Sequence, residues 1–273
     1  MDLYYVNSRN EKIDFYHRPY LVKNIDQLAD YSWDYEGEKS RIKYFSRGVC
    51  EIPFSINIFA DTEEEYHRAC DELFAIVEYD ILTNKRGKLF YGNQYIACNL
   101  IESKKEDWNK GIPFRILNIS VVTDFPYWIA ENNYTFQSYG ISSSNNKRYP
   151  GRYPYRYANG LNSSYIINEH FYDANFMMVV YGPVINPQVA IGGQSYLVNI
   201  VLEAGEYLEI DSRAGTVTKV MINGTRINAF HNRRKGGGFF KKVPPGRQVI
   251  SWTGKFDFDL ILYEERSEPR CSN

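Results

Sequence analysis

The stretch from Gly205 to Gly254 alternates short apolar segments with marked turns, and this pattern constrains the fold more than any other feature. Residues 216–222 are rich in β-branched and apolar side chains, which favour strands. Asn223-Gly224 follows, the pair that best tolerates the positive φ angles of a two-residue hairpin turn. The stretch predicts a β-sandwich or jelly roll, with further strands over residues 225–230, from Phe239-Phe240, and over residues 248–252 after the turn Pro244-Pro245-Gly246.

The last strand of this region carries two carboxylates on one face. Phe256, Phe258 and Leu260 alternate with Asp257 and Asp259, and this period of two places the acidic side chains together. Two such groups can act as general acid and base, or bind Ca²⁺. A solvated outer face of a sheet gives the same pattern, and it is the interpretation that we favour.

The first half of the chain predicts a β-rich domain with one helix. Residues 53–60 alternate apolar and polar side chains, as expected of a strand with one buried face. Thr62 and Glu65 have the spacing of a capping box, and apolar residues then recur at helical spacing through Tyr79. The other strands expected here are a hairpin over residues 87–98 with a Gly92-Asn93 turn, and a strand over residues 117–121.

The order of these motifs resembles that of distal tail proteins, the hub subunits at the tip of long, non-contractile phage tails. In the second half, the resemblance is carried by the G-E-Y-L-E-I-D strand, the K-V-M-I-N-G hairpin, the G-F-F-K-K-V-P-P-G turn and the closing V-I-S-W-T-G strand. In the first half, it is carried by a pair of strands around Y-L-V-K-N-I-D-Q-L-A-D-Y-S-W, the capped helix, the G-K-L-F-Y-G hairpin and T-D-F-P-Y-W.

A polar segment separates the two expected domains. Residues 137–146 are too poor in apolar side chains to fold alone, and the prolines of residues 148–157 disfavour a helix. We expect an N-terminal β domain with one helix over residues 1–130, which the resemblance implies to be ring-forming, and a linker or extended segment over residues 131–165. A galectin-like β-sandwich is expected over residues 166–265, with a flexible tail over residues 266–273.

Composition argues against several function classes. The formal net charge is −1, so no global field steers the chain toward nucleic acid or an anionic membrane. We expect neither a signal peptide nor a membrane span, because no basic start precedes an apolar run and no stretch approaches the required apolar length. The histidines and cysteines lack metal-binding spacing, and there is no G-x-S-x-G motif. We therefore expect no metal, no cofactor and no catalytic residue.

Two segments are candidate contact sites. A glycine-rich loop could cradle an anion with its backbone amides and basic side chains, or be a flexible connection between strands; its candidates are His231, Asn232, Arg233, Arg234 and Lys235. A second segment interleaves basic and aromatic side chains, which suits a protein interface better than single-stranded nucleic acid; its candidates are Arg148, Tyr149, Arg152, Tyr153, Tyr155, Arg156 and Tyr157.

The resemblance implies a structural virion protein rather than an enzyme. It implies a homohexameric ring, single or stacked, that joins the tail tube protein to a tail-associated tip protein and to receptor-binding or baseplate proteins. DNA would pass through its channel, and the subunit would reside at the virion tail tip after assembly in the host cytoplasm. The alternatives are a carbohydrate-binding module that anchors to a cell-wall saccharide and, third, a glycoside hydrolase that uses Asp257 and Asp259.

Overall fold

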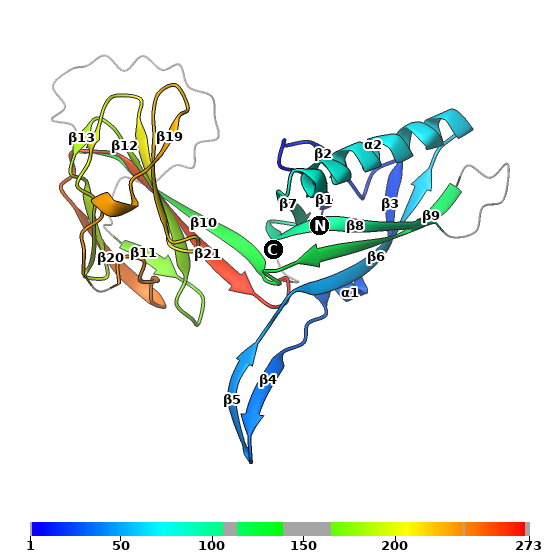
Figure 1. Ribbon diagram of the computed structural model, residues 1–273, viewed down its shortest axis with the longest axis horizontal. Coiled ribbons are helices and arrows are strands. Elements are labelled where there is room, and N and C mark those ends of the chain that lie inside the picture. The colour runs from blue at the N-terminus through cyan, green and yellow to red at the C-terminus, as the bar shows by residue number, and fades with distance from the viewer. Residues whose placement is uncertain (1, 106–113, 139–164, 237, 271–273) are drawn as a thin grey trace. The chain divides into compact units, whose positions relative to one another are not determined.

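The computed structural model describes residues 2–105, 114–138, 165–236 and 238–270, and the chain forms two compact units (Figure 1). Unit 1 comprises Met1–Ala130 and Glu265–Asn273, and unit 2 comprises Glu131–Glu264. Antiparallel strands dominate both units, and each unit has an apolar core of its own. The predicted class is confirmed: the fold is mainly β, with one long helix in the first half and a β-sandwich in the second.

Unit 1 is built from antiparallel strands, namely β1 (Leu3–Val6), β2 (Lys12–Asp14), β3 (Tyr20–Asn24), β6 (Cys50–Phe59), β7 (Gly87–Tyr91), β8 (Gln94–Lys105), β9 (Phe114–Thr123) and the first part of β10 (Trp128–Phe136). The first half of β8 pairs with β7, and its second half pairs with β9. One series of neighbours is therefore β10-β8-β7-β1-β2 and the other is β8-β9-β6-β3. The predicted hairpin at Gly92 is confirmed, since this residue has a φ of 61° between β7 and β8.

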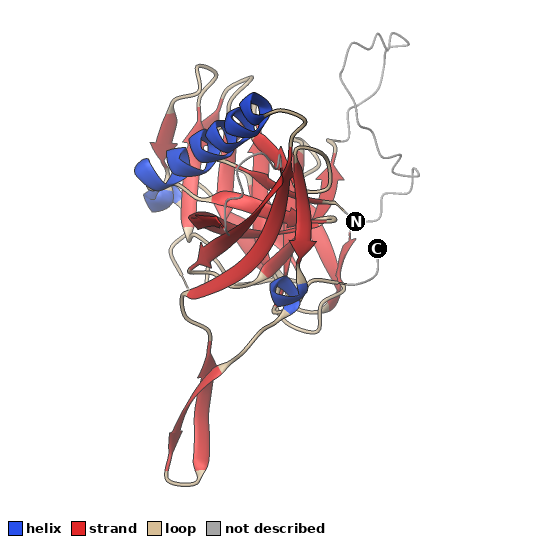
Figure 2. Cartoon of the chain, turned by 90° about the vertical axis from the view of Figure 1, so that its right-hand side faces the viewer, coloured by secondary structure: helices blue, strands red, loops and turns tan. Residues whose placement is uncertain are grey.

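The long helix α2 (Glu63–Leu82) packs on the strands of unit 1 (Figure 2). The Thr62 hydroxyl accepts a hydrogen bond from the Glu65 N–H at 3.2 Å, as the capping box predicts. The Glu65 carboxylate reaches back to the Asp61 N–H at 3.0 Å, one residue before the position expected for the box. The side chains that α2 buries recur at helical spacing; they are Tyr66, Ala69, Leu73, Ile76 and Asp80.

One prediction for unit 1 is wrong, because the expected pair of strands around residues 20–33 is a strand followed by a short helix. The Asn24 side chain at the end of β3 accepts a hydrogen bond from the Asp26 N–H at 2.8 Å, which favours the turn into α1 (Asp26–Ala29). Leu28 of α1 is buried, and its carbonyl accepts a hydrogen bond from the Trp128 indole at 3.2 Å. This turn of helix thus stands where the second strand was expected, and it places Leu28 in the core of unit 1.

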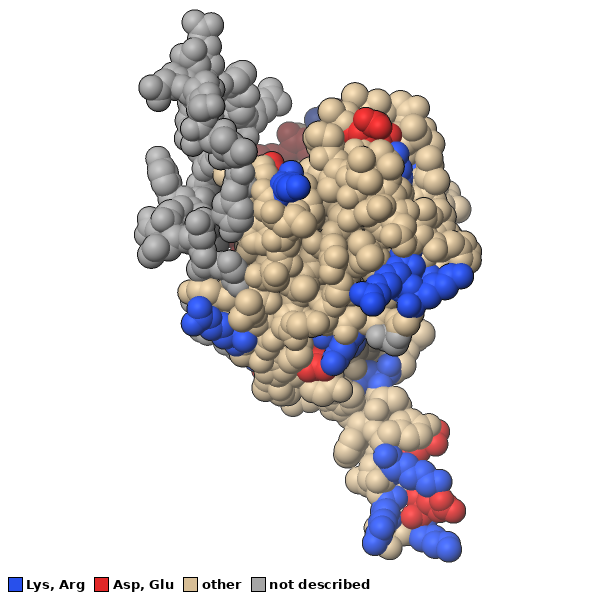
Figure 3. All heavy atoms as spheres, turned by 90° about the vertical axis from the view of Figure 1, so that its left-hand side faces the viewer, with Lys and Arg blue, Asp and Glu red and all other residues tan. Residues whose placement is uncertain are grey.

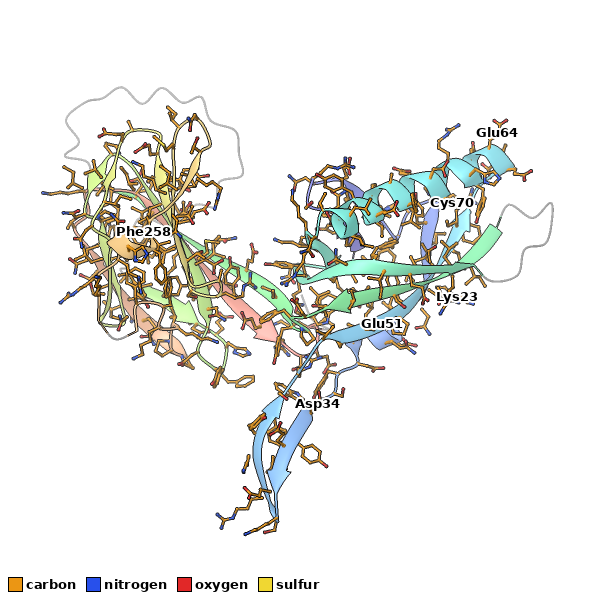
Figure 4. All side chains as sticks on the ribbon, in the orientation of Figure 1. Lys23, Asp34, Glu51, Glu64, Cys70 and Phe258 are labelled. Atoms are coloured by element: carbon orange, nitrogen blue, oxygen red, sulfur yellow. The ribbon has the colours of Figure 1, made fainter. Side chains whose placement is uncertain are left out.

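Unit 2 is a β-sandwich around an apolar core. One series of strands has the order β19-β18-β17-β12-β21, a second has the order β11-β20-β14-β15, and β13 pairs with β16. Their bounds are β11 (Tyr165–Asn168), β12 (Asn175–Tyr181), β13 (Val184–Ile185), β14 (Gln188–Ile191), β15 (Gln194–Leu197), β16 (Val201–Leu202), β17 (Tyr207–Asp211), β18 (Thr216–Val220), β19 (Arg226–Asn228), β20 (Gly246–Trp252) and β21 (Phe258–Arg266). Phe258 lies inside the sandwich and stacks on Phe136 with 4.6 Å between the ring centroids (Figure 4).

Two local predictions for unit 2 are wrong. Of the pair Asn223-Gly224, only Gly224 has a positive φ, and its N–H donates to the Met221 carbonyl, so the β18–β19 connection is longer than a two-residue turn. Phe239-Phe240 lies in a turn rather than a strand, because the Lys241 N–H donates to the Gly238 carbonyl at 2.8 Å. The Phe239 ring is nevertheless buried, which explains why this apolar pair resembles the start of a strand.

Candidate functional site

Unit 1 carries a hairpin of β4 (Asp34–Glu38) and β5 (Arg41–Ser46), here called the arm. Every residue of both strands is exposed, and the hairpin extends away from the other strands of the unit (Figures 1 and 2). A two-stranded hairpin is at best marginally stable in water by itself. The arm therefore has the character of a segment that a binding partner covers.

A β-bulge sorts the side chains of the arm into an apolar and a charged face. Tyr35 pairs with Phe45 and Gly37 pairs with Ile42, so that Lys43 is the extra residue between these pairs. The extra residue keeps Ile42 on the face of Tyr35 and Phe45, because side chains alternate between the faces of a strand. Tyr35, Ile42 and Phe45 are 67%, 56% and 60% exposed, so the arm presents an uncovered apolar face.

The other face of the arm is polar and charged. The Lys43 ammonium lies 2.5 Å from the Glu38 carboxylate. A hydrogen bond to Glu36 raises the pKa of the Tyr44 hydroxyl. Charges of both signs are visible at the end of the arm in Figure 3. The arm is thus amphipathic, and its apolar face is the one suited to docking.

Arg47 holds the base of the arm. Its guanidinium lies 5.2 Å from the centroid of the Tyr127 ring and 5.8 Å from that of the Trp33 ring, and it donates a hydrogen bond to the Pro126 carbonyl. The arm begins at Asp34, directly after this cluster (Figure 4). Its starting direction is therefore fixed by packed side chains.

The outward side of α2 offers a complementary surface. Phe74 and Leu82 are 62% and 77% exposed, so α2 presents apolar side chains to solvent. The first turn of the helix is acidic with Glu63, Glu64 and Glu65, and Figure 4 shows Glu64 near that end. α2 thus carries exposed apolar side chains, like the apolar face of the arm, and acidic groups opposite in charge to Lys39 and Arg41 near the turn of the arm.

In the predicted glycine-rich loop of unit 2, some side chains bond to other parts of the fold and others are exposed to solvent. Asn232 lies in a 3₁₀ turn, η1 (Phe230–Asn232), and its side chain donates to the Asn199 carbonyl at 2.9 Å. The Arg233 guanidinium lies 3.5 Å from the centroid of the Phe230 ring and donates to the Phe230 carbonyl at 2.6 Å. His231, Arg234 and Lys235 are exposed.

An open cavity of about 580 Å³ lies beside this loop. Three of the five predicted residues line this cavity, whereas His231 and Asn232 do not. Other lining residues were not among the predicted candidates. The lining residues are Arg233, Arg234, Lys235, Gly236, Gly238, Phe239, Phe240 and Lys241. Lys241 directly follows Phe239-Phe240, and it could have been predicted as a lining residue if this pair had been predicted as a turn.

The second predicted segment lies outside the described residues. This applies to all seven candidates, which are Arg148, Tyr149, Arg152, Tyr153, Tyr155, Arg156 and Tyr157. Their role at an interface stays a prediction.

The two carboxylates that were weighed as an acid/base pair bind other parts of the chain. Asp257 accepts a hydrogen bond from the Ser138 N–H at 2.6 Å. Asp259 accepts one from the Tyr181 hydroxyl at 2.7 Å. Burial and this hydrogen bond raise the pKa of Tyr181. Both contacts give the carboxylates a structural role at the surface of unit 2.

The described part of the chain has free thiols but no cluster of metal-binding side chains. No group of three or more His, Cys, Asp or Glu residues is arranged there to hold a metal ion. Cys50, Cys70 and Cys98 are free thiols, and burial raises the pKa of Cys98 to about 12, so this thiol is a poor nucleophile. Over these same residues, no helix has the length and apolar character required to cross a membrane.

Comparison with known proteins gives matches in structure alone. Neither a protein-family model nor a curated protein matches the sequence. The crystal structure of the Dit protein of phage SPP1, described as a paradigm of the hub adsorption apparatus in phages that infect Gram-positive bacteria, matches with a TM-score of 0.59 and 11% identity, over 96% of this chain and 98% of that one. Two structures of the phage p2 baseplate in its activated conformation, with Ca and with Sr, match with TM-scores of 0.63 and 0.62 and 12% identity, over 98% of this chain and 99% of theirs. The chain therefore has the fold of the SPP1 Dit hub protein along nearly its whole length, as the motif order predicted.

Proposed function

We propose that this chain is a structural hub subunit of a phage tail tip, and that its copies assemble into a ring. The arm is the main support for ring assembly, because its apolar face of Tyr35, Ile42 and Phe45 is exposed and would be buried by a contact with another copy. The fold shared with a phage hub protein and with a baseplate component supports the location in a virion tail.

The surfaces of unit 1 suit contacts between copies. If the arm of one copy lies on α2 of the next, the apolar face of the arm covers Phe74, and Lys39 and Arg41 near the turn of the arm meet the acidic start of the helix. Such a contact is head-to-tail, since two different surfaces of the same chain meet. Repetition of one head-to-tail contact closes a ring when its rotation allows closure, and we propose a homohexamer.

The ring would act as a connector. One side would bind the tail tube protein, and the other would bind a tip protein and receptor-binding or baseplate proteins. The channel would pass DNA without reading its sequence, in keeping with a net charge of −1. This function needs contact surfaces and no catalytic group.

Mass measurement in solution with negative-stain imaging tests the proposal. We expect the purified chain, alone or mixed with a tail tube protein, to form rings with an open centre. Phe45→Asp should disperse these rings, because a carboxylate would be buried against the next copy without a partner. Phe171→Asp is the matched control, since Phe171 is 87% exposed in unit 2 and lies outside the proposed contact.

Two results would contradict the proposal. The first is a monomer under all conditions, including with tail partners. The second is a ring that Phe45→Asp leaves intact, which would remove the arm from the interface and require another contact between subunits.

A further inference from the structure

The stretch from Ser212 to Phe256 contains no Asp and no Glu, although the whole chain is almost neutral. This stretch forms the second half of the sandwich in unit 2 and includes the glycine-rich loop. Its basic residues are Arg213, Lys219, Arg226, Arg233, Arg234, Lys235, Lys241, Lys242, Arg247 and Lys255. Figure 3 shows that Lys and Arg side chains gather in separate clusters on one face of the chain. Unit 2 therefore carries a local excess of positive charge.

About half of these cations are engaged within the fold. Lys219 forms an ion pair with Glu206 at 2.6 Å, and Arg226 forms one with Glu209. Others lie on aromatic rings, namely Arg213 on Tyr263, Arg233 on Phe230 and Arg247 on Tyr165. These groups stabilise the sandwich and are not available to a ligand.

Three cations at the cavity differ from these. Within the described residues, no acidic side chain forms an ion pair with Arg234, Lys235 or Lys241. The Arg234 N–H donates to the Leu197 carbonyl at 2.9 Å, so the backbone is fixed while the side chain is exposed. Gly236 leaves space beside them, because a Cβ at that position would have no atom within 4 Å.

We propose that this cavity binds phosphate groups of a phosphodiester-linked polyol polymer. Arg234 supplies the planar fork of donors that fits phosphate oxygens, and Lys235 and Lys241 add point charges around it. Uncompensated cations that converge on one cavity favour a ligand with repeated negative charges over a single weak anion.

The aromatic lining of the cavity favours a polymer without bases. Nucleic acid that is held without sequence readout normally stacks its bases on exposed rings. Phe239 is only 6% exposed and packs edge-on against Tyr196 and Phe240. Phe240 in turn stacks on Phe230 with 6.0 Å between centroids. The rings thus pack on one another as the cavity wall, with Phe239 buried and Phe240 half-buried, and the exposed cations supply the charge for recognition.

Titration of the full chain with poly(glycerol phosphate) tests this proposal, with inorganic phosphate and a single-stranded DNA of equal charge in parallel. Three phosphate contacts predict that affinity falls roughly twentyfold between 50 and 200 mM salt. The double substitution K235Q/K241Q should reduce that fall to roughly threefold, because about one contact remains. Lys255→Gln is the control, since this exposed cation belongs to the same basic stretch but does not line the cavity.

Binding of the polymer that the double substitution weakens and Lys255→Gln does not would support the proposal. Equal weakening by both variants would overturn it, because the general field of unit 2 would then account for binding. Equally tight, cavity-dependent binding of the DNA would overturn the choice of a polyol, and equal affinity for inorganic phosphate would overturn the choice of a polymer. Absence of binding at 50 mM salt would overturn the site itself. None of these results depends on ring formation, so this proposal and the hub function can fail separately.

Discussion

At the scale of single residues, unit 1 depends on a buried carboxylate near the end of α2. Asp80 has no exposed surface, and its oxygens accept hydrogen bonds from the Tyr5 hydroxyl at 3.0 Å and from the Ser8 N–H at 3.0 and 3.2 Å. Burial raises the pKa of Tyr5, so its hydroxyl stays a donor throughout the physiological range. These bonds connect the N-terminal strands to the helix across the core.

Removal of this carboxylate should destabilise unit 1. Asp80→Ala leaves the buried Tyr5 hydroxyl without its acceptor and removes the acceptor of the partly buried Ser8 N–H, and we expect the free energy of unfolding to fall by about 2–4 kcal/mol. Tyr5→Phe removes one of the donors to this carboxylate and leaves the Ser8 N–H in place, so a smaller loss of about 1.5 kcal/mol is expected. Urea denaturation measures both values, and a loss below about 0.5 kcal/mol for Asp80→Ala would contradict this account.

A glycine in unit 2 allows close approach of two backbone segments. A Cβ on Gly182 would lie 2.1 Å from the Glu203 carbonyl oxygen, which is backbone and cannot move aside easily. Gly182→Ala should therefore lower the free energy of unfolding by about 1–3 kcal/mol. The matched control is Gly48→Ala, since a Cβ there meets no atom within 4 Å. Equal stability of the two variants in urea would show that Gly182 is not under this constraint.

At the scale of elements, one ion pair links the start of β17 to β18. Glu206 accepts hydrogen bonds from the Glu203 N–H at 2.7 Å and from Lys219 at 2.6 Å, and these contacts hold the pKa of Glu206 below its ordinary value of 4.5. A lowered carboxyl pKa contributes stability above pH 4.5, and this contribution is lost as the pH falls through the folded-state pKa.

We predict that the free energy of unfolding depends on pH through Glu206, and that Glu206→Gln removes this dependence. Between about pH 5 and pH 3, the wild-type chain should lose stability more steeply than Glu206→Gln, and the two should become more similar at the acidic end. At pH 7 the variant should be less stable, because the charged partner of Lys219 is gone. Urea denaturation across this range gives both slopes, and parallel curves would rule out the linkage.

Much of the fold could be predicted from the sequence where local signals and tertiary packing agree. α2 has a capping residue and one apolar stripe, and the β7–β8 hairpin has a glycine at its turn. The arm was missed because a bulge at Lys43 breaks its alternation and no face of it is buried. At the cavity, the turn at Phe239 folds the end of the glycine-rich loop back beside its start, and the bridge between Val198 and Arg233 holds that start. All lining residues lie between Arg233 and Lys241, and Lys241 was missed because Phe239-Phe240 was predicted to open a strand rather than to lie in a turn.

At the scale of the whole molecule, the two units have separate cores. The core of unit 1 gathers around residues such as Tyr5 and Trp128, and that of unit 2 around residues such as Phe176 and Phe258. Since no residue belongs to both clusters, the packing inside one unit does not require the packing inside the other. In each unit one substitution is expected to be destabilising, Asp80→Ala in unit 1 and Gly182→Ala in unit 2.

The separate cores predict two unfolding transitions in the intact chain, and these two variants should assign each transition to a unit. Asp80→Ala should lower the midpoint of one thermal transition and leave the other in place, and Gly182→Ala should do the reverse, because each affects a single core. Differential scanning calorimetry of the wild type and of both variants makes the comparison. A single transition that both variants shift equally would mean that the units unfold cooperatively. In that case a docking event on one unit would stabilise the other as well, and arm contacts in a ring would also stabilise the sandwich that carries the basic cavity.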